Sequence, residues 1–134
     1  MRVLASISAI VFGLGLAAPP ASAATLDGSV PMLCALTSIV ECTHGGDCQR
    51  TSAQSAEVPS FIRVDIQKKM LSTVDGARTS PIANVNRADG QLMFQGMQNG
   101  RAWGAVIDEK TGWLGSTVSE SDGAIVIAGV CTVP

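Results

Sequence analysis

The sequence has no tyrosine, a single histidine and only nine lysine and arginine residues, which form no cluster. Nucleic-acid binding requires a concentrated positive surface, so we expect no nucleic-acid partner. Attraction to an anionic membrane surface is disfavoured for the same reason. The absence of tyrosine also removes a side chain that often anchors protein–protein contacts. The mildly acidic balance of charge fits an ordinary folded domain and identifies no partner.

Motifs that carry catalysis or cradle phosphate are missing as well. The only histidine, His44, lies between two cysteines, and no G-x-S-x-G segment supplies a nucleophile for it to activate. The sequence contains neither G-x-x-x-x-G-K-[ST] nor G-x-G-x-x-G. Asp108 and Glu109 are adjacent, but neighbours on a strand point apart, which disfavours a glycosidase pair. We therefore expect no catalytic residue, no cofactor and no enzyme.

The N-terminal residues have the three-part layout of a secretory signal peptide. A positive residue, Arg2, precedes an apolar run over residues 3–18, and a small-residue triplet at 21–23 follows two prolines. The run is short for a membrane span, which needs about 20 apolar residues. We predict a signal peptide over residues 1–23 and one mature domain over residues 24–134.

Export follows from this prediction, but its destination stays open. No cysteine directly follows the apolar run, and no second run is long enough to cross a bilayer. We expect no stable membrane anchor after cleavage and a protein that is periplasmic or secreted. The oligomeric state is not indicated by any pattern in the chain.

Four cysteines, all in the mature chain, are the main structural signal. An even number of cysteines in a small exported domain indicates disulfides, and four allow three pairings. We favour Cys34–Cys131 together with Cys42–Cys48. Gly45 and Gly46 can adopt the backbone angles that a short closed loop needs. The long-range pair would tie the start of the fold to its last strand.

A metal site is the alternative for this cysteine segment. Zinc sites commonly use a C-x2–4-C spacing with further ligands, whereas the second and third cysteines are spaced C-x5-C around His44 and Asp47. Redox and haem motifs require C-x-x-C, which is absent. Met93 and Met97 share one strand face and offer copper(I) ligands, but packing against a neighbouring strand or loop is a far commoner role for such methionines. We expect no metal.

From Phe61 onward the pattern indicates short strands joined by tight turns. The segment "FIRVDI" alternates with period 2, as a half-buried strand does. Further strands are expected in "KKMLSTV", "TSPIANVNR", "WLGSTVS" and "AIVIAGVC". Residues 31–43 fit a strand or a short helix, and residues 49–60 fit a loop or an edge strand. The predicted fold class is all-β, a small antiparallel meander that forms a barrel or a sandwich.

The best-determined unit is the hairpin "QLMFQGMQNGRAWGAVID", because Asn99-Gly100 is a strong two-residue turn signal. Such a turn fixes the register and places Gly96 opposite Trp103, so that the indole ring folds over the glycine. The other predicted pairs on this face are Gln98–Arg101, Phe94–Ala105 and Leu92–Ile107. The opposite face is mixed and is expected to meet water. In "AIVIAGVC" the apolar residues do not alternate with polar ones, which predicts a last strand covered on both faces.

The runs "LCALTSIVEC", "SPIANV", "FQGMQNGRAWGAVID" and "IAGVC" resemble a group of small exported bacterial proteins, of proteobacterial type, with paired cysteines and no assigned activity. The resemblance covers most of the mature chain and transfers no catalytic residue. In outline, a disulfide-braced exported β domain is also similar to bacterial lysozyme-inhibitor barrels, although their inhibitory motif has no counterpart here.

Three functions are compatible with these patterns. The first, which the sequence patterns favour most, is a non-enzymatic binding or inhibitor-like module whose turns and 42–48 loop contact an envelope or extracellular protein. The second is a carrier that holds a small apolar ligand inside a barrel, because about eight strands enclose room for one. An enzyme is the third and least favoured.

Overall fold

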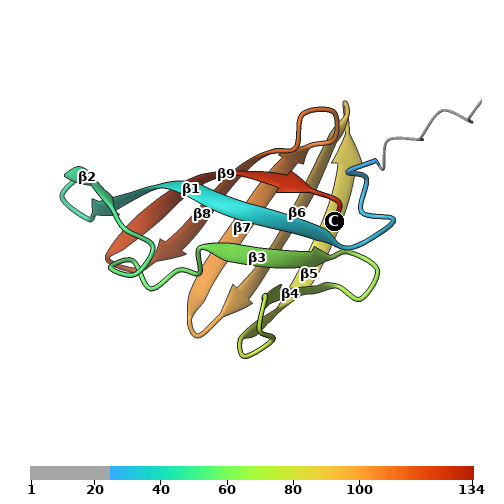
Figure 1. The fold of residues 1–134 in the computed structure, drawn as a ribbon. Coiled ribbons are helices and arrows are strands. Elements are labelled where there is room, and N and C mark those ends of the chain that lie inside the picture. Colours follow the sequence, from blue (N-terminus) through green and yellow to red (C-terminus); the bar gives the residue numbers. More distant parts are fainter. Residues whose placement is uncertain (1–24) are drawn as a thin grey trace, which may run out of the picture.

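Figure 1 shows the computed structural model, which describes residues 25–134. The expected signal peptide, residues 1–23, lies outside this part of the chain. Nine strands and no helix form the described part. They are β1 (Met32–Thr43), β2 (Cys48–Thr51), β3 (Phe61–Asp65), β4 (Met70–Thr73), β5 (Thr79–Ala88), β6 (Gln91–Gln98), β7 (Arg101–Asp108), β8 (Trp113–Glu120) and β9 (Gly123–Thr132).

Eight of these strands close into an antiparallel barrel, which confirms the all-β prediction and selects the barrel over the sandwich. Strands β3 to β9 pair in chain order, and β1 pairs with β3 on one side and with β9 on the other. The β1–β9 pairing runs from Leu33 to Thr43 and closes the ring. Strand β2 pairs only with the second half of β1, outside this ring (Figure 1). Residues 25–134 include no helix that could span a membrane.

Two-residue turns fix the register of the meander. Asn99 and Gly100 both have positive φ, 50° and 78°, as a type I′ hairpin requires. The four predicted cross-strand pairs of this hairpin are all present. Asp89 and Gly90, with φ of 52° and 74°, form an equivalent turn between β5 and β6 that the sequence analysis did not single out. These turns set which side chains of β5, β6 and β7 point into the barrel.

The barrel interior is filled with side chains at one end. Its fully buried members come from β1, β3, β6 and β7 and are Met32, Cys34, Val64, Leu92 and Ile107. A second, smaller cluster lies where the 52–58 segment covers the inner side of β1 and β9; it comprises Ile39, Ala56, Ile125 and Ile127. Between the two clusters the interior is not filled.

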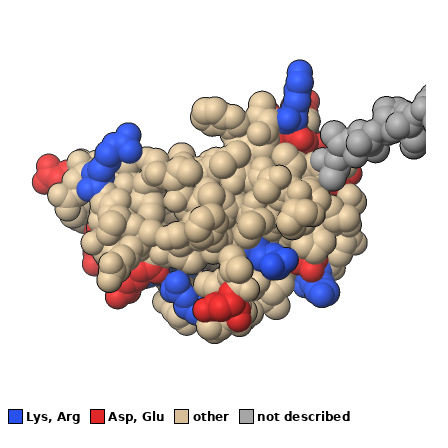
Figure 2. All heavy atoms as spheres, in the orientation of Figure 1, with Lys and Arg blue, Asp and Glu red and all other residues tan. Residues whose placement is uncertain are grey.

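The prediction that the last strand is covered on both faces is wrong. Along β9, inward Ile125 and Ile127 are buried, whereas Val126 and Val130 on the outer face are 47% and 46% exposed. Valine and alanine favour strands whether or not they are buried, so composition concealed the alternation. Figure 2 shows that the outer surface over β1 and β9 is uncharged and that charged side chains lie at its margins.

Two disulfides brace this barrel, and they join the pairs that the sequence favoured. Cys34 and Cys131 lie on adjacent strands, with Cα atoms 3.9 Å apart, and connect β1 to β9 inside the barrel. Cys42 and Cys48 connect β1 to β2, with Cα atoms 4.1 Å apart. No cysteine of the described part is free. Two disulfides fit an oxidising, non-cytoplasmic environment.

Candidate functional site: the barrel cavity

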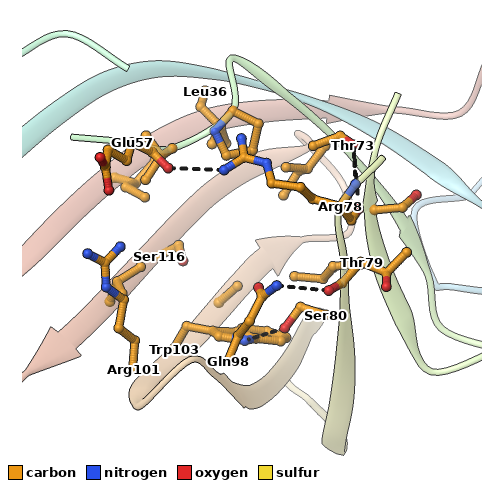
Figure 3. A pocket seen from close by; sticks show the side chains of 18 of the residues that line it. Leu36, Glu57, Thr73, Arg78, Thr79, Ser80, Gln98, Arg101, Trp103 and Ser116 are labelled. Carbon is orange, nitrogen blue, oxygen red and sulfur yellow. Dashed lines mark hydrogen bonds between the residues drawn. The ribbon is translucent and has the colours of Figure 1, made fainter. Parts of the chain in front are cut away.

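The unfilled part of the interior is a cavity of about 680 Å³ (Figure 3). Its lining residues come from all eight barrel strands, so the cavity is the lumen of the barrel and not a surface groove. The volume falls within the range of roughly 300–1,000 Å³ typical of small-molecule sites. The larger apolar side chains of the wall are Leu36, Ile62, Leu71, Phe94, Leu114 and Ile127.

The cavity exists because small side chains face inward at one level of the sheet. Ala105 on β7 pairs with Ser116 on β8, and both line the cavity. Two residues deeper, Ile107 pairs with Leu114 and Leu92, and Leu92 and Ile107 are fully buried. The barrel interior is therefore packed at the level of Leu92 and Ile107 and hollow at the level of Ala105 and Ser116. The fully buried residues form a floor that closes the cavity at one end.

Trp103 forms one side of the wall and is held by three contacts. Its indole ring covers Gly96, where an added Cβ would lie 2.5 Å from the ring. The Trp103 Nε1–H donates to Ser80 Oγ at 2.9 Å. The ring also packs edge-on against Phe94, with centroids 6.2 Å apart and planes at 71°. These contacts leave the indole half-buried, with part of its surface lining the cavity.

Two hydroxyls of the wall, those of Ser80 and Ser116, already have partners. Ser116 Oγ donates to the Gly104 carbonyl oxygen at 2.8 Å, and Ser80 Oγ accepts from Trp103. Within residues 25–134 no buried side-chain nitrogen or oxygen lacks a hydrogen-bond partner. An apolar molecule could therefore contact Ser80 and Ser116 without leaving either hydroxyl unpaired, which favours burial of such a molecule.

The mouth of the cavity is polar (Figure 3). Arg78, in the β4–β5 turn, donates from Nη1 to the backbone carbonyl of Glu57 at 3.3 Å. Gln98 Nε2 donates to the Thr79 carbonyl at 2.9 Å. Arg101 is paired with a carboxylate of β8, the Glu120 side chain, at 2.8 Å. The lumen is therefore a one-ended cup with an apolar wall and a charged rim.

Residues 42–48, for which a metal site was the alternative interpretation, form a disulfide-closed hairpin. Cys42 and Cys48 are bonded to each other, so neither offers a thiolate. His44 and Asp47 are exposed, and the Thr43 N–H donates to the Asp47 carbonyl across the turn. In the described part of the chain no group of three or more His, Cys, Asp or Glu residues is placed to hold a metal ion.

Met93 and Met97 share the outer face of β6, as their spacing predicts. Met97 is 68% exposed and Met93 is half-buried. Trp113, the second tryptophan, is 72% exposed on the outer face of β8. None of these three side chains lines the cavity.

Asp108 and Glu109 serve the β7–β8 turn. The Asp108 carboxylate accepts from the Thr111 N–H at 2.7 Å and the Thr111 hydroxyl at 2.9 Å, and it also accepts from the Lys110 N–H at 3.0 Å. These hydrogen bonds, those from Thr111 first, hold the pKa of Asp108 below its ordinary value. Glu109 pairs with Arg87 through two hydrogen bonds of 2.7 and 3.0 Å. Hydrogen bonds from Ser29 likewise lower the pKa of Asp27 to about 2.

These depressed pKa values predict a loss of stability in acid. A carboxylate with a lowered folded-state pKa stabilises the fold above its unfolded pKa of about 3.9 and loses that contribution as the pH falls through the folded value. Asp108→Asn removes the charge and keeps an acceptor oxygen. We expect D108N to melt below the wild type at pH 7, and we expect the difference in melting temperature to shrink as the pH falls below the ordinary aspartate pKa. Melting curves between pH 7 and pH 2 check this; a difference that is constant with pH would contradict it.

A ligand site inside a barrel was one of the predicted functions, but the residues that line the cavity and its rim were not predicted from the sequence. The inward pair of small residues, Ala105 and Ser116, is the signal that could have located it, since both sit at inward positions of their strands. Arg78 and Glu57 lie outside any periodic pattern, and their positions at the mouth follow only from closure of the ring.

Comparisons with models of protein families, with curated proteins and with solved structures found no match.

Proposed function

We propose that this protein is an exported, non-enzymatic carrier that binds a small apolar ligand in the barrel lumen. The observation that supports it is the cavity of about 680 Å³, which has a closed floor and a wall contributed by all eight barrel strands. Soluble barrels of this size hold either side chains or one small ligand. Here side chains fill only one end, which leaves room for a ligand at the other.

The location that accompanies this proposal is periplasmic or secreted. Both disulfides favour an oxidising compartment, and the N-terminal pattern predicts export. The expected contact of the 42–48 loop with an envelope or extracellular protein stays a prediction. It is compatible with ligand carriage, because this loop lies on β1 and β2 and does not line the cavity.

Obstruction of the lumen tests the proposal. Ala105→Phe adds a ring to an inward position of β7, whereas Ala102→Phe adds the same ring to the exposed outer face of the same strand. Titration with the uncharged fluorescent probe N-phenyl-1-naphthylamine is expected to show saturable binding to the wild type and to A102F. We expect A105F to bind at least about tenfold more weakly, since the ring occupies the volume that the probe needs.

The two tryptophans provide an independent readout. Trp103 lines the cavity and Trp113 is exposed outside it. In a Trp113→Phe background, ligand entry is expected to change the emission of Trp103. Ser116→Leu obstructs the same level of the lumen from β8 and guards against misfolding of A105F. Absence of saturable binding to the wild type, or equal binding by folded A105F, S116L and A102F, would overturn the proposed function.

A further inference from the structure

We infer that the lumen takes a single-tailed amphiphile with an anionic head group, tail first, with the head held by Arg78 at the mouth. This inference rests on the proposed function and specifies the chemical class of its ligand. It follows from the polarity of the cavity along its depth and from the charges at its rim.

The change in polarity from the closed end of the cavity to its mouth fixes the orientation of the ligand. Phe94, Ala105 and Leu114 line the closed end of the cavity, and Leu92 and Ile107, which lie behind them in the packed core, are fully buried and apolar. Two polar groups of the wall, Ser80 and Ser116, are already hydrogen-bonded to Trp103 and to a backbone carbonyl. A polar head group placed at the floor would lose its hydration without gaining a partner, which is costly. The apolar end must therefore enter first, and the polar end stays at the mouth.

The charge of the rim selects the head group. Among the residues of the described chain, Arg101 is neutralised by Glu120 at 2.8 Å, whereas Arg78 has no carboxylate within ion-pairing distance. The Glu57 carboxylate points away from the Arg78 guanidinium, which contacts only its backbone oxygen (Figure 3). Arg78 is therefore the cation at the opening that forms no ion pair, and the Asp75 carboxylate of the same turn acts on it only at longer range, by a coulombic interaction without direct contact.

Arg78 also has unused donor capacity. A guanidinium carries five N–H donors, and in residues 25–134 that of Arg78 donates to one acceptor, the Glu57 carbonyl. The fork of a guanidinium matches the two oxygens of a carboxylate, and a charge-assisted pair is stronger than a neutral hydrogen bond. A single-tailed carboxylate satisfies both the apolar wall and this rim cation.

The test uses three ligands with the same twelve-carbon tail and different heads: dodecanoate, dodecanol and dodecyltrimethylammonium, each below its micelle-forming concentration. Binding is followed by the emission of Trp103 in the Trp113→Phe protein. We expect dodecanoate to bind roughly tenfold more tightly than dodecanol, and the cation to bind most weakly. Arg78→Gln is expected to abolish the preference for dodecanoate over dodecanol, measured as the ratio of the two affinities in the same variant.

Lys110→Gln removes the same charge from the exposed β7–β8 turn and serves as the control that retains the preference. If none of the three ligands binds, the proposed function fails. If dodecanol binds as tightly as dodecanoate, or R78Q keeps the preference, the lumen binds ligands but this inference is wrong. Tightest binding of dodecyltrimethylammonium would also overturn this inference, because it would show that a carboxylate of the rim, such as that of Glu57, contacts the head group in place of Arg78.

Discussion

Replacement of both Cys34 and Cys131 by alanine is expected to lower the free energy of unfolding by about 4 kcal/mol. The disulfide joins residues separated by 97 positions, and a cross-link that closes so long a loop removes much of the entropy of the unfolded chain. Both cysteines are buried in the main core, so the substitutions also remove packing atoms. For a domain of this size the melting temperature is expected to fall by roughly 15 °C.

The second disulfide supplies the matched control. Cys42 and Cys48 are separated by six positions, and Cys48 is exposed. The same entropy relation gives about 2 kcal/mol for this short loop, without a packing loss. Thermal and denaturant unfolding of C34A/C131A and C42A/C48A measures both values. A C34A/C131A variant that is at least as stable as C42A/C48A would show that β1–β9 pairing holds the barrel closed without its cross-link.

Local features of the fold could be predicted because they depend on neighbours in the sequence. The Asn99-Gly100 turn fixes the pairing of β6 with β7, and the position of Trp103 over Gly96 follows from it. The sequence left the segment 31–43 open between strand and helix, since the strands that pair with it, β3 and β9, lie far along the chain. Its strand conformation depends on those distant partners, which no local pattern contains.

Features that depend on closure could not be predicted. The hollow of the lumen depends on Ala105 and Ser116, which are paired across β7 and β8 and both line the cavity. That pairing arises only when the sheet forms. The role of Arg78 at the mouth depends on the position of the β4–β5 turn relative to the 52–60 segment. The exposed outer face of β9 was missed because valine serves equally at buried and exposed strand positions.

Substitution of Gly96 by alanine is the second large effect that we expect. A Cβ at this position would lie 2.4 Å from the Pro81 carbonyl oxygen and 2.5 Å from the Trp103 ring. The first of these atoms belongs to the backbone of β5, so the strand itself must shift. Overpacking of this kind costs up to about 3 kcal/mol, and we expect that value for G96A.

The same substitution is expected to disturb the lumen, because the displaced Trp103 ring is part of the cavity wall. Gly115→Ala is the matched control: an added Cβ there meets no atom within 4 Å, and its effect is expected to stay within about 0.5 kcal/mol. Unfolding curves of both variants, together with Trp103 emission in the Trp113→Phe background, measure stability and wall geometry in one experiment. If G96A were as stable as G115A with unchanged emission, then the β5 backbone and the indole would have room to move. The close packing of glycine against tryptophan would then not be what positions the wall of the cavity.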